Sequence, residues 1–399
     1  MRRNIRKEFR ESMDAIQFSQ DAKDVMVDTL LARMETQEAP RRRGGKKLLL
    51  VGLAAAVVLG TLTGAAVFTR WSKSAQAYYN PSQEIKEQAE KSGLSVMLET
   101  KTEETNPSEV LSATDQGVTV TLVQSIVDNY EAELTFRIEG FTLPEGQDPW
   151  AFWDRNSITI DGSRDFSVSK TGGFYDGTTR DENGEWVYAS NGQPVASRDD
   201  EFQSAILEWV AADGSMEYTI YIHFRDTSGA YLGKEIAVHF DGFGTGPMKG
   251  GIMEEKLVDG SWDLHWTLTG ADNADNSLTI SPNAEIGDSG MTLLEAEIGQ
   301  KTIRAVYQLD HDWDGWKELE SLPNDLQAVR MKNGDMVLVV PSGGNYGKME
   351  TEHICENTYS TFGGLIDISQ VESLAFHKGW EKDENGKPTI ETFYYVPVG

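Results

Sequence analysis

An alternation of apolar and polar residues recurs along the chain after about residue 108. It is clear in the segments VTVTLV, residues 118–123, and AELTFRIE, residues 132–139, where Glu133 and Thr135 take two of the polar positions. A period of two is typical of strands that bury one face and expose the other. Both segments are therefore predicted to be half-buried β-strands.

Similar short runs, separated by turn residues, continue to the C-terminus. The Gly-rich stretch 242–251 is typical of a joint between domains, and Asn333-Gly334 predicts a hairpin turn. We therefore expect a mainly β region built of two tandem immunoglobulin-like β-sandwiches, at residues 109–245 and 246–399. The further predicted strands are 157–160, 205–210, 218–224, 235–240, 262–268, 277–280, 301–308, 327–331, 336–340, 371–376 and 392–396.

One segment departs from this pattern because it is apolar without interruption. Residues 48–68, LLLVGLAAAVVLGTLTGAAVF, form a run of 21 residues that carries no charge. At about 1.5 Å per helical residue, this length spans the ~30 Å hydrocarbon core of a bilayer. We expect one transmembrane helix here, followed by a polar stalk at residues 69–108.

Basic residues are placed unevenly about this run. Five of them lie within residues 41–47, against Arg70 and Lys73 after the run. Because positive residues stay on the cytoplasmic side, residues 1–47 are expected in the cytoplasm and the C-terminal region outside the cell. A cleaved signal peptide is the alternative, since Ala75-Gln76-Ala77 resembles an A-x-A cleavage site. The run exceeds the apolar length of about 7–15 residues in such peptides, which favours an uncleaved anchor.

Small residues recur every four positions within the apolar run. On a helix they form one stripe that includes a GxxxG pair, the kind of surface on which two membrane helices pack closely. The stripe predicts self-association of the membrane helix, although Gly and Ala are frequent in membrane helices generally. Its residues are Gly52, Ala56, Gly60 and Gly64.

The N-terminal 47 residues have helical periodicity. Ser19 is a good N-cap, acidic residues follow in the first turn and Pro40 lies beyond the end, which predicts a helix over about residues 20–36. An earlier amphipathic helix is predicted between Ile5 and Ile16. The apolar face of the second helix, here called the tail face, comprises Ala22, Val25, Met26, Thr29, Leu30 and Met34.

Two apolar faces in so short a cytoplasmic α-helical tail cannot bury much surface on their own. Domains of that size ordinarily need disulfides or a metal to be stable. We therefore expect a partner protein to cover the tail face. The alternative is an interfacial helix that lies on the inner leaflet of the bilayer.

Charge and cysteine content exclude some classes of protein. Residues 1–47 carry 12 Lys+Arg against 8 Asp+Glu, a net charge of +4, so the rest of a chain whose net charge is −28 carries −32. So acidic a region is expected to bind no nucleic acid. The single cysteine, Cys355, excludes an intramolecular disulfide and hence a disulfide-stapled secreted design.

The sequence contains no recognisable catalytic arrangement, so we do not expect an enzyme. The six histidines show neither an HExxH motif nor close ligand spacing, and there is no Walker A loop and no GxSxG. Trp262 and Trp266, four residues apart in one predicted strand, are more typical of a sandwich core than of a sugar site.

One acidic segment has the beginning of a calcium loop. Asp310, Asp312 and Asp314 take alternate positions before Gly315, and hard cations such as calcium prefer such oxygen ligands. The match ends at the twelfth position, where Ser321 replaces the usual Glu. Calcium is therefore the one cofactor that the sequence suggests, and the alternative is an ordinary Asp-rich turn.

The order of these features resembles a known family. A Ser-capped helix (FSQDAKDVMVDTLLARM), a basic run and one membrane helix precede the segments KSGLSVMLET, TDQGVTVTLVQSIVDNYEAELTFRIEG and, near the C-terminus, GLIDISQVESLAFHKG. This order resembles the membrane-anchored anti-sigma-factor-like proteins of Gram-positive bacteria, whose β-rich ectodomains have no characterised function. The tail departs from the zinc-type members, because it lacks their His and Cys spacing.

The resemblance implies a single-pass membrane regulator. Its tail would sequester a sigma factor, and its ectodomain would sense a condition of the cell envelope. The alternative is a cell-surface binding or adhesion module whose tail serves only as an anchor.

Overall fold

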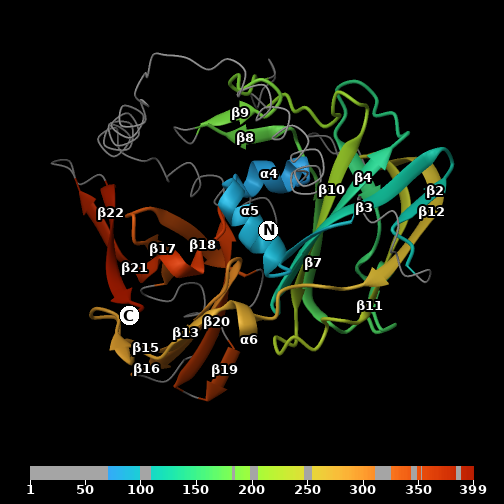
Figure 1. Ribbon diagram of the computed structural model, residues 1–399. Helices are drawn as coiled ribbons and strands as arrows, with labels where there is room; N and C mark the ends of the chain where they lie inside the picture. The colour runs from blue at the N-terminus through green and yellow to red at the C-terminus, as the bar shows by residue number, and fades with distance from the viewer. Residues whose placement is uncertain are drawn as a thin grey trace, which may run out of the picture. The chain divides into compact units, whose positions relative to one another are not determined.

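The described part of the chain is mainly β, as the alternation predicts (Figure 1). The described residues up to Phe376 form one compact unit together with Tyr394–Gly399, and His377–Phe393 are grouped apart from it. Within the residues that the structure describes, no helix has the length and apolar character needed to cross a bilayer. The predicted membrane helix and the predicted cytoplasmic tail lie outside the described residues. The computed structural model describes residues 71–98, 109–181, 185–197, 205–246, 254–310, 325–342, 348–351, 353–382 and 388–399.

The first half of the described chain contains two antiparallel sheets. The six-stranded sheet has the order β1-β3-β4-β10-β7 with β2 paired to β3, and the four-stranded sheet has the order β12-β11-β5 with β6 paired to β11. A separate small sheet pairs β8 with β9. The strands are β1 (Ser95–Met97), β2 (Ser112–Asp115), β3 (Val118–Val127), β4 (Glu131–Glu139), β5 (Pro149–Phe152), β6 (Ile158–Ile160), β7 (Ser167–Phe174), β8 (Thr178–Arg180), β9 (Trp186–Tyr188), β10 (Met216–Phe224), β11 (Glu235–Thr245) and β12 (Glu255–Thr267).

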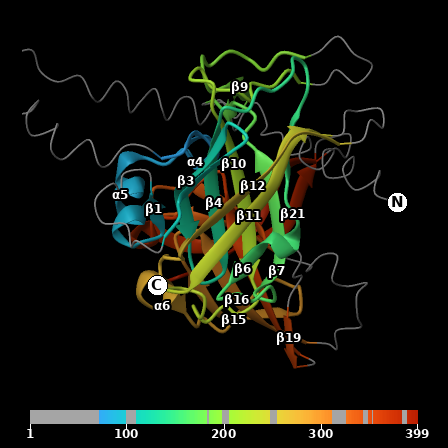
Figure 2. The same cartoon turned by 90° about the vertical axis from the view of Figure 1, so that its right-hand side faces the viewer.

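The two larger sheets pack face to face over one core. Buried residues of both sheets, including Leu122, Phe136, Phe240 and Trp262, belong to a single hydrophobic cluster. Figure 2 shows β11 and β12 crossing in front of β3, β4 and β10. The indole nitrogen of Trp262 donates to the carbonyl of Val118 at 2.9 Å, so even the polar atom of this buried ring is satisfied. This half is a β-sandwich.

The first sandwich extends beyond its predicted end. β12 pairs with β11 from Thr245↔Glu255 to Glu235↔Thr267, and the Gly-rich stretch begins within β11 at Gly242. Gly244 is needed for this pairing, because a Cβ there would lie 1.8 Å from the carbonyl oxygen of Glu255. The boundary predicted at residues 245 and 246 therefore moves to about Leu268, since glycines that suit a joint also suit the close approach of two paired strands.

The second half is one ten-stranded sheet instead of a second pair of sheets. Its order is β13-β15-β16-β20-β18-β17-β21-β22, with β14 paired to β15 and β19 to β20. Leu278 near one end of this path and Tyr394 near the other pack against the same core, so the sheet curves around that core. The strands are β13 (Leu278–Ile280), β14 (Ala284–Glu285), β15 (Met291–Ile298), β16 (Thr302–Leu309), β17 (Leu326–Met331), β18 (Met336–Pro341), β19 (Lys348–Thr351), β20 (Ile354–Phe362), β21 (Val371–Lys382) and β22 (Pro388–Pro397).

Two further local predictions have opposite outcomes. The Asn333-Gly334 hairpin is confirmed: β17 pairs with β18, and Gly334 has a φ of 93° that suits the turn. Residues 205–210 form no strand, and Ala205 makes only an isolated bridge with Ser197.

The segment His377–Phe393, which is grouped apart from the compact unit, has an ionisable pair of its own. Within it, His377 Nδ1 lies 2.7 Å from Glu391 Oε1.

The predicted polar stalk is wrong over residues 71–98, because these residues pack on the fold. They form α4 (Lys73–Tyr79), α5 (Gln83–Lys91) and β1. Trp71, Ala75 and Tyr79 are buried in a cluster of their own, and β1 pairs with β3. The segment is rich in Gln, Glu, Lys and Ser, so its composition concealed the few apolar residues that anchor it. A short helix, α6 (Asn273–Asn276), and two 3₁₀ turns, Arg155–Ser157 and Ile368–Gln370, complete the described elements.

Strand β4 also differs from its prediction as a half-buried strand. Its alternation places Glu133 and Thr135 on an exposed face, but each is only 1% exposed. The hydroxyl of Tyr79 in α4 donates to Glu133 Oε2 at 2.7 Å, which satisfies part of this buried carboxylate. The packed N-terminal helices therefore help to cover the second face of the strand.

Candidate functional site

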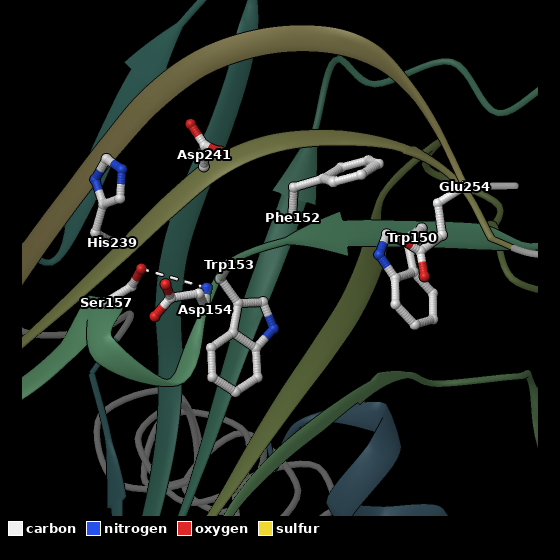
Figure 3. A pocket seen from close by; sticks show the side chains of 8 residues that line it. All are labelled: Trp150, Phe152, Trp153, Asp154, Ser157, His239, Asp241 and Glu254. Atoms are coloured by element: carbon white, nitrogen blue, oxygen red, sulfur yellow. Dashed lines mark hydrogen bonds between the residues drawn. The ribbon is translucent and has the colours of Figure 1, made fainter. Parts of the chain in front are cut away.

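A cavity of about 440 Å³ lies on the outward face of the four-stranded sheet (Figure 3). Ala151 of β5 and Phe240 of β11 are buried in the sandwich core, so the residues next to them in sequence point to the opposite face. We call this cavity the aromatic pocket. It is lined by Trp150, Phe152, Trp153, Asp154, Ser157, His239, Asp241 and Glu254.

Three aromatic side chains, those of Trp150, Phe152 and Trp153, lie within four residues of sequence at this pocket. In the view of Figure 3, Trp150 lies on the right beside Glu254, and Trp153 lies below Phe152. Trp150 is 38% exposed, an unusual degree for the largest apolar side chain. An exposed indole at the edge of a cavity is a surface on which a ligand can stack.

The ring of Trp153 is held in place by a hydrogen bond to the opposite sheet of the sandwich. Its indole nitrogen donates to the hydroxyl of Tyr218 in β10 at 2.5 Å. Burial raises the pKa of Tyr218 to about 12, so its phenol stays protonated at neutral pH. The floor of the aromatic pocket is therefore tied to the opposite sheet of the sandwich, and the ring need not be ordered when a ligand binds.

Three carboxylates line the aromatic pocket in different states. Asp154 accepts from the backbone amide of Asn156 in the 3₁₀ turn, and Asp241 accepts from Lys256 Nζ at 3.0 Å. Glu254 is exposed and makes no hydrogen bond or ion pair with the residues that the structure describes. Glu254 is thus the carboxylate with most freedom to meet a ligand.

The same Lys256 gives an example of cation recognition beside the pocket. Its Nζ lies 5.3 Å from the centroid of the Phe152 ring and also contacts Asp259 Oδ1 at 3.2 Å. The hydrogen bond to Asp241 raises the pKa of Lys256, so the ammonium stays charged. An ammonium can therefore reach an aromatic face here with carboxylates around it.

A second group of charged residues is buried inside the fold. We call it the Lys301 cluster; it joins β4 and β10 of the first sandwich to β16 of the ten-stranded sheet. Lys301 Nζ forms a short ion pair with Glu131 Oε2, and His223 Nδ1 lies 3.1 Å from the other oxygen. Lys301 is 2% exposed. The cluster comprises Asp128, Glu131, Glu133, His223 and Lys301.

Burial and pairing act against each other on these groups. Burial alone would raise the pKa of Glu131, but the Lys301 ammonium and His223 outweigh it and hold that pKa well below its usual value. Burial alone would lower the pKa of Lys301, and the surrounding carboxylates raise it instead. For Asp128 and Glu133 burial prevails, so the pKa of each is raised. The cluster is an internal ion-pair network that joins two sheets.

The residues singled out in the sequence are not brought together in the described part of the chain. The tail face and the small-residue stripe lie outside it, as do Asp312 and Asp314. Asp310 follows β16, and its backbone amide donates to the carbonyl of Gly290 at 2.9 Å. Within the described ranges no group of three or more His, Cys, Asp or Glu residues could hold a metal ion. Calcium binding remains a prediction.

The aromatic pocket itself was missed from the sequence. Its residues come from β5 and the 3₁₀ turn that follows it, from β11, and from the position just before β12, and a prediction of strands without their order cannot bring these together. A local hint was present, since Trp150, Phe152 and Trp153 stand close together next to Asp154.

Comparisons with known proteins give one distant likeness. No family model matches the sequence, and no curated protein matches it. Among solved structures, the crystal structure of the conserved domain protein from Bacillus anthracis is similar at 13% identity with a TM-score of 0.37. The match covers 72% of this chain and 84% of that chain.

Proposed function

We propose that the chain is a single-pass membrane regulator of the anti-sigma-factor type. In this proposal residues 48–68 anchor it, the tail face binds a sigma factor in the cytoplasm, and the β-rich region responds to a condition outside the cell. The observation that carries the proposal is the uncharged run between a basic tail and an acidic folded region. No enzymatic activity is part of the proposal.

The start of the fold supports a regulator over a passive tether. Phe68 ends the apolar run, and Trp71 is already buried at 7% exposure, with its indole nitrogen donating to Glu90 at 3.2 Å. Only Thr69 and Arg70 separate the two. A flexible stalk would absorb any movement of the folded region, whereas a connection of two residues would pass it to the anchor.

The anchor and the tail have separate parts in this proposal. The stripe of small residues would let two anchors pair closely, so that a change in the folded region could alter the pairing. The tail face would hold the sigma factor at the membrane and away from DNA.

Co-purification with the full-length protein tests the proposal. Tagged protein extracted in mild detergent from its own cells should bring a sigma factor with it. Leu30→Asp should abolish this capture, because burying an unpaired charge costs several kcal/mol, against roughly −8 kcal/mol for micromolar binding. Lys23→Asp, on the polar side of the same helix, is the matched control and should retain the sigma factor. Absence of any sigma factor from the wild-type preparation would refute the proposal.

The aromatic pocket favours a second candidate, a cell-surface binding or adhesion module. Exposed aromatic side chains over a cavity are typical of a ligand site and need no signalling tail. This candidate replaces the first if the tail captures no sigma factor while the β-rich region retains a ligand from outside the cell.

A further inference from the structure

The aromatic pocket combines aromatic faces with an excess of acidic side chains. Its eight lining residues include three carboxylates, Asp154, Asp241 and Glu254, and neither Lys nor Arg. The region of the chain that contains it is strongly acidic, because residues 48–399 carry −32 of a net charge of −28, against +4 for residues 1–47. Lys256 offsets Asp241, but the other two carboxylates and the acidic region around the pocket still favour cations over anions.

The aromatic rings add a preference among cations. A small hydrated metal ion prefers several convergent oxygen ligands, and the described residues offer no such group. An organic ammonium group differs, because its carbon frame can stack on an indole while its charge interacts with the ring face. The pocket offers the exposed ring of Trp150 for the frame and Glu254 for the charge.

Lys256 of the same chain shows how an ammonium group can lie between an aromatic ring and carboxylates at this place. Its ammonium stands over Phe152 at 5.3 Å and is held by Asp241 and Asp259. Trp150 alternates with Phe152 along β5, so both rings project from the same face of the strand. Trp150 and Glu254 line the same cavity and offer a second ring and a second carboxylate of the kinds that Phe152 and Asp241 present to Lys256.

We propose that the aromatic pocket binds an organic ammonium group, with its carbon frame on Trp150 and its charge against Glu254. The ammonium can be carried by a lysine side chain of a peptide or by an amino sugar, because both present the same charge on an apolar frame. The inference rests on the proposed function only where it makes this ligand the external signal; the binding itself stands apart from the tail.

Titration calorimetry on the full-length protein in detergent micelles tests the proposal with two matched pairs of probes. Nα-acetyl-lysine methylamide is compared with its neutral Nε-acetyl form, and glucosamine with neutral N-acetylglucosamine, at low salt and slightly acidic pH. Each charged probe should bind at least about fivefold more tightly than its neutral form, and the tighter of the two identifies the carrier. Equal binding of the charged and neutral forms would overturn the proposal in favour of a site for neutral sugars or amides.

Variants locate the binding and separate it from folding. Trp150→Ala and Glu254→Gln change exposed side chains, so both proteins should fold normally, and each should weaken the charged probe by about five- to tenfold. Trp186→Ala, a 51% exposed indole on β9, and the exposed Glu145→Gln are matched controls and should bind as the wild type does. Unchanged affinity in both pocket variants would overturn the assignment. If the protein still captures a sigma factor but binds no ammonium probe, the assignment of the ligand is refuted and the proposed function is not affected.

Discussion

At the scale of single residues, the buried charges decide most about this fold. Lys301, Glu131, Glu133 and Asp128 are each at most 4% exposed, and such groups are stable in a protein interior only when they are paired. The Lys301 ammonium lies among all three carboxylates and links β4 to β16. One lysine therefore compensates several buried negative charges across two sheets.

Replacing this lysine should be costly. Lys301→Met leaves the carboxylates without their cation, and breaking a buried pair in this way costs about 3–5 kcal/mol of unfolding free energy. Adding Glu131→Gln should recover part of the loss, because it removes the nearest uncompensated charge. Urea unfolding followed by tryptophan fluorescence measures both. Lys234→Met is the control: its half-exposed ion pair with Asp161 at 3.3 Å should contribute less than about 1 kcal/mol. Equal losses in the two lysine variants would contradict the account.

A partly buried carboxylate outside the Lys301 cluster makes stability depend on pH. Asp325 accepts from the hydroxyl of Tyr359 at 2.6 Å, and burial raises its pKa from 3.8 to about 6. A raised pKa in the folded state means that the stabilisation is complete below about pH 4 and is lost as the pH rises through about 6. Asp325→Asn cannot ionise, so it should gain about 3 kcal/mol relative to the wild type at pH 7.5 and little at pH 4.

Melting temperatures of the two proteins at both pH values check this expectation. Asp288→Asn, at an exposed position of the same half of the chain, serves as the control and should follow the wild type. A constant difference between Asp325→Asn and the wild type across this range would exclude ionisation of Asp325 as the cause.

At the scale of helices and strands, the features that depend only on residues close together in the sequence could be predicted from it. Val118, Val120 and Leu122 alternate because their strand buries one apolar face in the core, and Asn333-Gly334 turns because glycine accepts a positive φ. Glu133 was misplaced because its burial depends on Tyr79, a residue more than fifty positions away in the chain. The aromatic pocket was missed for the same reason, since it depends on which strands become neighbours.

The helices α4 and α5 give a direct test of the packed N-terminal segment. Lys86 N donates to Ser82 O at 3.0 Å and Ser92 N to Gln88 O at 2.9 Å, while Ala89 is fully buried. Amide hydrogen exchange of α5 should therefore be at least about a hundredfold slower than in an unstructured peptide. Trp71→Ala should speed exchange in α5 and leave β10 unchanged, because Trp71 contacts Glu90. If α5 of the wild-type protein exchanged as fast as an unstructured peptide, the packed segment would be refuted and the predicted polar stalk would be correct.

At the scale of the whole molecule, the proposed function depends on which parts lie on which side of a membrane. The basic residues at 41–47 and the uncharged run after them favour a cytoplasmic N-terminus. The chain offers a clean background for testing this, because its single cysteine, Cys355, is fully buried. Burial also raises the pKa of that thiol to about 11, which keeps it protonated and unreactive at neutral pH.

Single introduced cysteines should therefore report topology without removal of the native one. Glu145→Cys places a thiol at an exposed position of the β-rich region, and Glu38→Cys places one in the tail. A maleimide that cannot cross membranes should label Glu145→Cys on intact cells and should reach Glu38→Cys only after the membrane is permeabilised. The wild-type protein should stay unlabelled in both cases, because Cys355 is neither exposed nor ionised. Labelling of Glu38→Cys on intact cells, with Glu145→Cys protected, would show the opposite orientation. The tail would then lie outside the cell and could not contact a cytoplasmic sigma factor.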